Sequence, residues 1–127
     1  MEIPEELYYT EEHEWMSYEE AEGIATIGIT DYAQGELGDI VYVELREGGE
    51  HVKRKEPFGT IEAVKSVEEL FAPVSGEIVE VNTELENHPE LVNADPYGDG
   101  WMIKIKVENP EEIDSLLGAA DYRKHIS

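Results

Sequence analysis

The sequence predicts a mainly β protein with short helices near its C-terminal end. Residues 24–30, 39–45 and 77–82 are rich in β-branched residues and alternate, at least in part, between apolar and polar positions. This two-residue period is typical of half-buried strands. Turn-forming glycines such as Gly48 and Gly49 bound these runs. Since single domains run to about 100–200 residues, the 127-residue chain predicts one domain over residues 1–127.

The first half of the chain predicts a hairpin, a short helix and several strands. Trp15 to Tyr18 is expected to pair with the 24–30 strand across an acidic turn that ends at Gly23. Asp31 to Gly38 begins with a capping-type residue and ends in glycine, which predicts one or two helical turns. Further strands are expected at 39–45, 58–64, 67–72, 77–82 and 101–107.

The last third of the chain predicts a long irregular stretch and then helices. Residues 82–100 are rich in Asn, Pro, Gly and acids, with a loop expected over 93–100 and one helical turn over 89–92. Asn109-Pro110 predicts a helix start, with Asn109 as the N-cap. Ile113, Leu116 and Leu117 would lie on one face of that helix, which ends near Gly118, and a second short helix would run through Tyr122.

One internal repeat is present. Residues 38–43 and 76–81 share the pattern Gly-acid-Ile-Val-x-Val at a spacing of 38 residues. Two copies cannot form a solenoid, which needs about three repeats. The repeat indicates either a chance match between two strands or two halves related by a quasi-twofold axis.

The charge of the chain excludes several partners. Thirty-one acidic residues against nine Lys and Arg give a net charge of −22, and thirteen acids but no Lys or Arg precede Arg46. Such a surface repels phosphate backbones and anionic lipids, so nucleic-acid and membrane binding are not expected. It suits basic docking faces, or it serves solubility alone. Without a membrane-span run, signal-peptide pattern or cysteine, a prokaryotic cytoplasmic protein is expected.

No self-sufficient active site is visible in the sequence. The four histidines are scattered without metal-ligand spacing, and the serines lie in no Gly-x-Ser-x-Gly motif. Pairs of acids suit a glycosidase, but with 31 acids such pairs arise by composition alone. A stand-alone hydrolase stays open as an alternative, and it would need convergent acids in a cleft.

Lys65 differs from the other polar residues. It is the only Lys or Arg between Lys55 and Lys104, and strand-like residues flank it on both sides. This pattern predicts a lysine at the tip of a hairpin. Such a lysine could pair with Glu62, Glu68 or Glu69, which contributes less than about 1 kcal/mol at a surface. It is also what an enzyme needs to attach a prosthetic group, because the amine is reachable and its base is fixed.

Four segments of this chain resemble the glycine cleavage system H-protein family. They cover nearly the whole chain in the family's order and spacing: His13-Glu14-Trp15 within residues 9–15, residues 25–45, Glu62-Ala63-Val64-Lys65 within residues 58–77, and residues 93–105. The departures are small. The family usually has Glu-Ser-Val-Lys-Ala, where this chain has Ala63 and Ser66, and it usually has Leu-Pro-Glu, where this chain has Arg46.

The resemblance implies a fold and a cofactor. The fold is a lipoyl/biotinyl-type flattened β-barrel, or hammerhead, with quasi-twofold symmetry, which would account for the repeat. The cofactor is lipoate, joined by an amide to Lys65, with Glu62, Val64 and Gly76 as recognition residues of the attachment motif. Glu14 is implied to lie in the cleft that protects the loaded arm.

The resemblance also implies a carrier that is not itself an enzyme. Its partners would be the pyridoxal-phosphate enzyme glycine decarboxylase, a tetrahydrofolate-dependent aminomethyltransferase, dihydrolipoamide dehydrogenase and a lipoylating enzyme. An H-like protein that donates lipoyl groups to other enzymes is the alternative. A biotin-bearing domain is disfavoured, because its lysine normally lies between methionines, whereas Lys65 lies between Val64 and Ser66.

Overall fold

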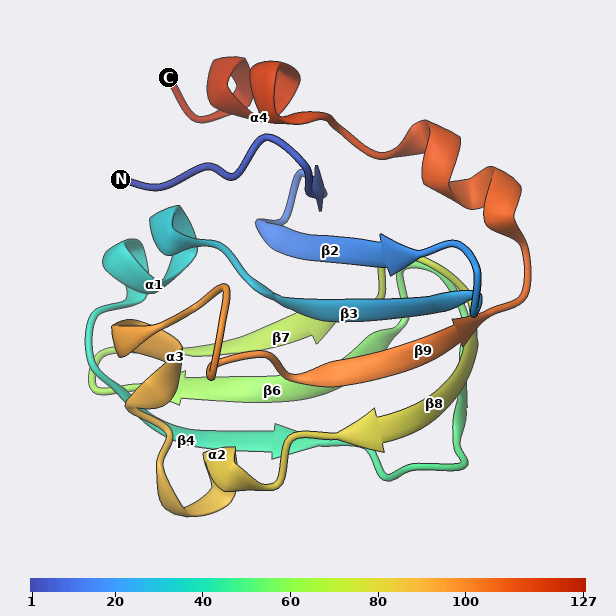
Figure 1. Ribbon diagram of the computed structural model, residues 1–127. Coiled ribbons are helices and arrows are strands. Elements are labelled where there is room, and N and C mark those ends of the chain that lie inside the picture. The colour runs from blue at the N-terminus through green and yellow to red at the C-terminus, as the bar shows by residue number, and fades with distance from the viewer.

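The strands form two antiparallel sheets that face each other across an apolar core (Figure 1); the computed structural model describes residues 1–127. The larger sheet has the order β1-β2-β3-β9-β8-β5 and the smaller one the order β4-β6-β7. No strand pairing closes the two sheets into one continuous barrel. The strands are β1 Tyr8–Tyr9, β2 Glu14–Glu19, β3 Ile24–Ile29, β4 Ile40–Leu45, β5 His51–Val52, β6 Pro57–Ala63, β7 Val67–Phe71, β8 Gly76–Val81 and β9 Ile103–Val107.

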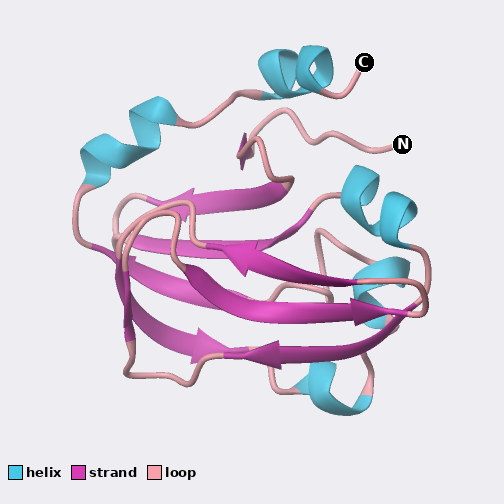
Figure 2. Ribbon diagram, turned by 180° about the vertical axis from the view of Figure 1, so that it is seen from behind, coloured by secondary structure: helices cyan, strands magenta, loops and turns pink.

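Short helices lie around the edges of the sheets (Figure 2). They are α1 Asp31–Leu37, α2 Glu84–Asn87, α3 Leu91–Ala94, the 3-10 helix η1 Pro110–Ser115 and α4 Ala119–His125. None has the length and apolar character that a membrane-spanning helix requires.

The predicted strands and the first hairpin are confirmed, whereas two short strands were not expected. β2 pairs with β3 in the register Glu14↔Ile29 to Glu19↔Ile24. β1 and β5 have only two residues each, which is too short to show a two-residue period. Their strand geometry comes from their neighbours, since β1 pairs with β2 and β5 with β8.

The structure corrects several details of the predicted helices. The side chain that caps α1 belongs to Thr30, whose Oγ1 accepts from the Ala33 N–H, and not to Asp31. Asn109 makes no side-chain capping bond, and the segment after it is a 3-10 helix that ends at Ser115. Within residues 82–100, α2 was not expected, and the helical turn predicted at 89–92 lies at Leu91–Ala94.

The repeated strands are equivalent in local structure. β4 and β8 lie in different sheets, and each has a register shift at its valine, between Ile40 and Tyr42 and between Ile78 and Glu80. In both copies the isoleucine is buried and the following valine is half exposed, at 48% for Val41 and 45% for Val79. A chance match between sequences would not reproduce the same irregularity at the same position, so the repeat reflects the architecture.

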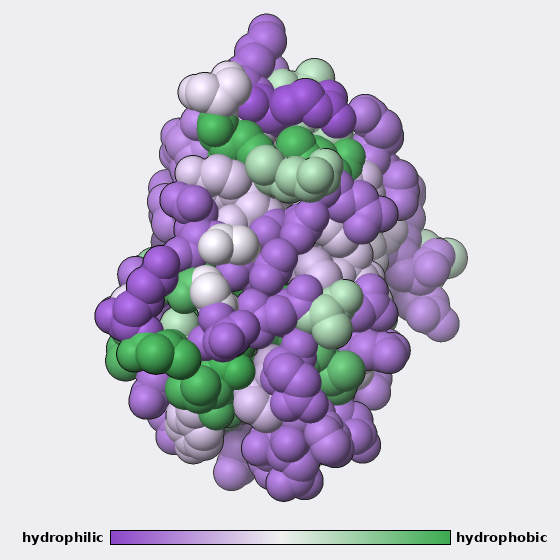
Figure 3. Space-filling model, turned by 90° about the vertical axis from the view of Figure 1, so that its left-hand side faces the viewer, coloured by the Kyte–Doolittle hydropathy of each residue, from purple (hydrophilic) through white to green (hydrophobic).

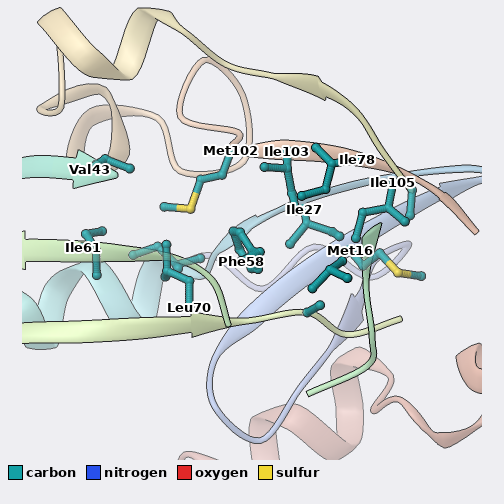
Figure 4. Close-up of a cluster of buried hydrophobic side chains, with 14 of the residues drawn as sticks. Met16, Ile27, Val43, Phe58, Ile61, Leu70, Ile78, Met102, Ile103 and Ile105 are labelled. Carbon is teal, nitrogen blue, oxygen red and sulfur yellow. The ribbon is translucent and has the colours of Figure 1, made fainter. Parts of the chain in front are cut away.

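The core between the sheets consists mainly of aliphatic side chains from both of them (Figure 4). Phe58, Ile61 and Leu70 come from the smaller sheet, and their partners from the larger sheet are Ile27, Ile78, Ile103 and Ile105. Burial of each such side chain contributes about 1.5–3 kcal/mol. This core fixes both strands of the β6–β7 hairpin from one side.

A second apolar cluster holds the C-terminal helix against the start of the chain. It consists of Tyr9, Trp15, Ala119 and Tyr122, with Tyr9 stacked on Tyr122 at 4.6 Å between ring centroids. A Cβ at Gly28 would lie 2.7 Å from the Trp15 indole nitrogen, so β3 needs glycine there. The cluster places α4 beside the residues that precede β2.

Candidate functional site

Lys65 lies at the tip of a two-residue hairpin. The Ala63 N–H donates to the Ser66 carbonyl over 2.8 Å, and this bond leaves Val64 and Lys65 as the central residues of the turn. Below the turn, β6 and β7 pair with each other from Glu62↔Val67 to Pro57↔Phe71. At the base of the turn the Val64 N–H donates to the Asp39 carbonyl over 3.2 Å. The hairpin is therefore attached to the segment that precedes β4.

The ammonium of Lys65 has no carboxylate partner. The side chain is exposed, and none of the four ion pairs in the structure includes it. The alternative considered for this lysine, an ion pair with Glu62, Glu68 or Glu69, is thus absent. Lys104 differs, because its Nζ lies 3.3 Å from Glu80 and over the Trp101 ring. Lys65 is free to react where Lys104 is engaged.

Apolar side chains surround the tip of the hairpin. Val64 and Val67 are 77% and 64% exposed, and Val41 and Tyr42 of β4 are about half exposed. Figure 3 views the end of the molecule that carries the hairpin and shows a mainly hydrophilic surface broken by separate apolar patches. Exposed apolar groups next to a reachable lysine are suited to recognition by an enzyme.

The two remaining recognition candidates lie in different places. Glu62 is exposed near the end of β6, two residues before the turn. Gly76 lies at the other end of β7, where it begins β8 and is buried. A Cβ at Gly76 would lie 2.0 Å from the Lys106 carbonyl oxygen. Glycine at this position is therefore explained by the close approach of β8 to β9.

A groove of about 450 Å³ runs between α1 and β7. Its apolar surface comes from Ile29, Tyr32, Ala33, Leu37, Ile61, Leu70 and Phe71. Six glutamates also line it, namely Glu11, Glu12, Glu14, Glu36, Glu68 and Glu69. The groove thus offers apolar walls and a strongly negative potential, which suits an elongated apolar group that ends in a cation.

Glu14 is the buried carboxyl of this groove, with only 2% of its surface exposed. The Thr10 hydroxyl donates to its Oε1 over 2.5 Å, and the Phe71 N–H donates to its Oε2 over 3.2 Å. Burial raises the pKa of Glu14 to about 7, although both hydrogen bonds act in the opposite direction. A cation placed beside this carboxyl would favour its ionised form.

His13 is a groove residue that the sequence did not single out. Its backbone is left-handed, with φ of 76°, and its Nδ1 lies 2.9 Å from the Tyr122 hydroxyl, which also contacts Thr30 Oγ1 over 2.8 Å. Burial and the neighbouring His125 lower the pKa of His13. Tyr122 is distant in sequence, so no local pattern could have shown this contact. No group of His, Asp and Glu side chains is arranged to hold a metal ion.

Comparisons with known proteins agree on one family. The family model for the glycine cleavage H-protein matches residues 7–127. Two relatives, both named glycine cleavage system H protein, are from Salinibacter ruber, with 56% identity over 96% of this chain and 97% of the relative, and from Chlorobium chlorochromatii, with 57% identity over 99% and 98%. A crystal structure of the H protein from Mycobacterium marinum superposes with a TM-score of 0.86 at 38% identity, covering 98% of each chain.

Proposed function

Because this chain belongs to the glycine cleavage H-protein family, we propose that it is the lipoyl carrier of a glycine cleavage system, with lipoate joined by an amide to Lys65. The observation that supports the attachment site is the exposed, unpaired lysine at the tip of a two-residue hairpin. Glu62 and Val64 lie next to this lysine on the surface, and we propose that they are read by a lipoylating enzyme. Gly76 would serve that recognition only indirectly, by maintaining the fold.

We propose that the protein acts as a carrier and not as a catalyst. The lipoyl group, when attached, supplies the disulfide that takes up the aminomethyl group of glycine. The partners are then glycine decarboxylase, the aminomethyltransferase, dihydrolipoamide dehydrogenase and the lipoylating enzyme. Since the named relatives are bacterial, we propose a cytoplasmic location, with the whole chain acting as one domain.

The groove fits a lipoyl arm in length and in chemistry. From Val67 to Phe71, β7 advances about 13 Å at the usual rise of a strand. The roughly twelve bonds from the Cα of a lysine to the first sulfur of a lipoyl group extend to about 14 Å. An arm attached at Lys65, two residues before Val67, therefore extends along most of β7 toward Glu14, whose carboxyl accepts from the Phe71 N–H. The apolar side chains of the groove suit the methylenes of the arm.

We propose that Glu14 protects the carried amine. The attached lipoyl group would carry this amine as an ammonium at neutral pH, and loss of its proton would open the way to breakdown into formaldehyde and ammonia. A buried carboxylate beside the amine raises the pKa of the amine and so holds its proton. Each unit by which the amine pKa rises lowers the reactive fraction about tenfold. The other groove glutamates add to the negative potential.

The attachment site is tested with Lys65→Arg. The variant should keep the fold, because the side chain is exposed, and should lose all lipoate-dependent glycine cleavage. Intact-mass measurement of protein purified from its own cells should show the lipoyl mass on the wild type only. Lys104→Arg is the matched control and should be lipoylated normally. A Lys65→Arg protein that carries lipoate and is active would contradict the assignment.

The role of Glu14 is tested with Glu14→Ala and Glu14→Gln. Both variants should be lipoylated normally, since Glu14 lies away from the hairpin tip. Formaldehyde release from the purified, loaded protein, measured without the transferase, should be about tenfold faster than in the wild type. Glu108→Ala, which removes an exposed acid outside the groove, is the control and should leave the half-life unchanged. Equal half-lives for all proteins would remove Glu14 from the mechanism.

A further inference from the structure

Helix α1 forms one wall of the groove but has little of its own to hold it in place. It has only seven residues, none of them buried, although Ala33 and Leu37 pack partly against the core. Isolated helices of this length are not stable in water. Besides this packing, the position of α1, and with it the width of the groove, depends on contacts at the two ends of the helix.

Asn93 holds the C-terminal end of α1. Its Oδ1 accepts from the Ile40 N–H, and its Nδ2 donates to the Gly38 carbonyl and to Gln34 Oε1, each over 2.9 Å. One side chain thus joins the last turn of α1 to the first residue of β4. Gly38 ends the helix at a φ of 79°, so the chain reverses sharply at the point that Asn93 holds.

Tyr97 holds the N-terminal end of the same helix. Its hydroxyl accepts from the Asp31 N–H over 3.0 Å and donates to the Glu2 carbonyl over 2.8 Å. Burial raises the pKa of Tyr97 to about 12, so the hydroxyl keeps the proton that it donates. Asn93 and Tyr97 lie only four residues apart, yet they contact opposite ends of α1.

The same contacts extend to the attachment hairpin. Between Gly38 and Ile40, both held by Asn93, lies Asp39, whose carbonyl accepts from the Val64 N–H next to Lys65. We propose that Asn93 and Tyr97 are positioning residues that hold α1 as the outer wall of the groove, and that Asn93 also keeps the Lys65 hairpin in register with that wall. The role of the groove as the binding place of the lipoyl arm rests on the proposed function, whereas the hydrogen bonds that Asn93 and Tyr97 make do not.

The proposal is tested by amide hydrogen exchange on the protein without lipoate. Tyr97→Phe should speed exchange of the Gln34 amide, and Asn93→Ala should speed exchange of the Gly38 and Val64 amides. Each change should be at least about tenfold, the factor that corresponds to the loss of one hydrogen bond, because Tyr97→Phe removes two such bonds and Asn93→Ala removes three. The Met102 amide, which donates to the Ile27 carbonyl in the larger sheet, should stay within about twofold of the wild type.

Asn109→Ala is the matched control, because the Asn109 side chain makes no capping bond, and it should leave all four amides unchanged. If Asn93→Ala does not fold, Tyr97→Phe, which removes a single oxygen, and Asn93→Asp, which keeps only the acceptor for Ile40, provide the same test. Unchanged α1 amides would overturn the proposal. Equal acceleration of the α1 and Met102 amides would also overturn it, since that result indicates general destabilisation.

A second measurement separates this proposal from the proposed function. Loaded Tyr97→Phe protein should release formaldehyde faster, in proportion to the exchange of the Gln34 amide, because both processes follow the fraction of molecules in which the wall is open. Faster exchange with unchanged formaldehyde release would keep the positioning role and contradict the groove as the place of the loaded arm.

Discussion

At the scale of single residues, Glu14 makes the stability of the protein depend on pH. Its pKa is raised from 4.5 to about 7, chiefly by burial. Between these two values the folded protein holds a proton that the unfolded chain has released. Stability therefore falls as pH rises from 4.5 to 7, by an amount on the order of 3 kcal/mol in total. A buried carboxyl that lowers the stability of the folded protein in this way is expected where function requires it.

This dependence predicts a difference between the wild type and Glu14→Gln. The amide oxygen can accept from the Phe71 N–H, and the amide NH2 group can donate to the Thr10 hydroxyl oxygen in place of the present acceptor. Since both contacts are then made without a charge, the variant should be more stable than the wild type at pH 8 and similar at pH 4.5. Urea unfolding at several pH values measures both. The lowered pKa of His13 acts in the opposite direction, but it acts in both proteins. Parallel pH profiles for the two proteins would show that Glu14 is not protonated in the folded state.

At the scale of elements, glycines divide into those that packing requires and those that it does not. Gly76 lets β8 approach β9, and a Cβ there would overlap the Lys106 carbonyl. Gly35 lies within α1, and a Cβ there would meet no atom within 4 Å. The same substitution should therefore have opposite effects at the two positions.

We expect Gly76→Ala to destabilise the protein by about 3 kcal/mol or more, because the backbone of β9 must move. Gly35→Ala should stabilise it by roughly 0.5–1 kcal/mol through the helix preference of alanine. Thermal and urea unfolding of both variants give the two values. A stable Gly76→Ala protein would mean that β8 can shift away from β9, and the recognition role proposed for Gly76 would then be open to direct test.

At the scale of the whole molecule, the net charge of −22 governs encounters with partners. The ammonium of Lys65 becomes a neutral amide on lipoylation, so attachment makes the carrier one unit more negative. Long-range attraction to a basic face accelerates association and is screened by salt.

We expect the rate of reaction with glycine decarboxylase to fall steeply as ionic strength rises. The Debye length shrinks from about 30 Å at 0.01 M to about 8 Å at 0.15 M, so most of the fall should lie in this range. The rate is measured at carrier concentrations well below saturation, with turnover at saturation as the control for salt effects on the enzyme. A flat profile would assign the acidity to solubility alone.

The sequence by itself determined the seven longer strands, the β2–β3 hairpin and the exposed turn at Lys65. These features are local, because a two-residue period and a turn are encoded by neighbouring residues. It also contained the repeat, although only the matching register shifts at Val41 and Val79 distinguished architecture from chance. Asn109 lies at the predicted N-cap position, but its side chain makes no capping bond, because a capable residue still needs a helix start in the right geometry.

Only the tertiary structure decided the groove. Its walls come from segments distant in sequence: the residues around Glu14, α1 and β7. The raised pKa of Glu14 follows from burial, and burial depends on how the elements pack. The contacts of Asn93 with Gly38 and Ile40 span 55 and 53 residues. A residue pattern specifies which side chains are available, but the fold brings them within hydrogen-bonding distance and excludes the water that would otherwise compete.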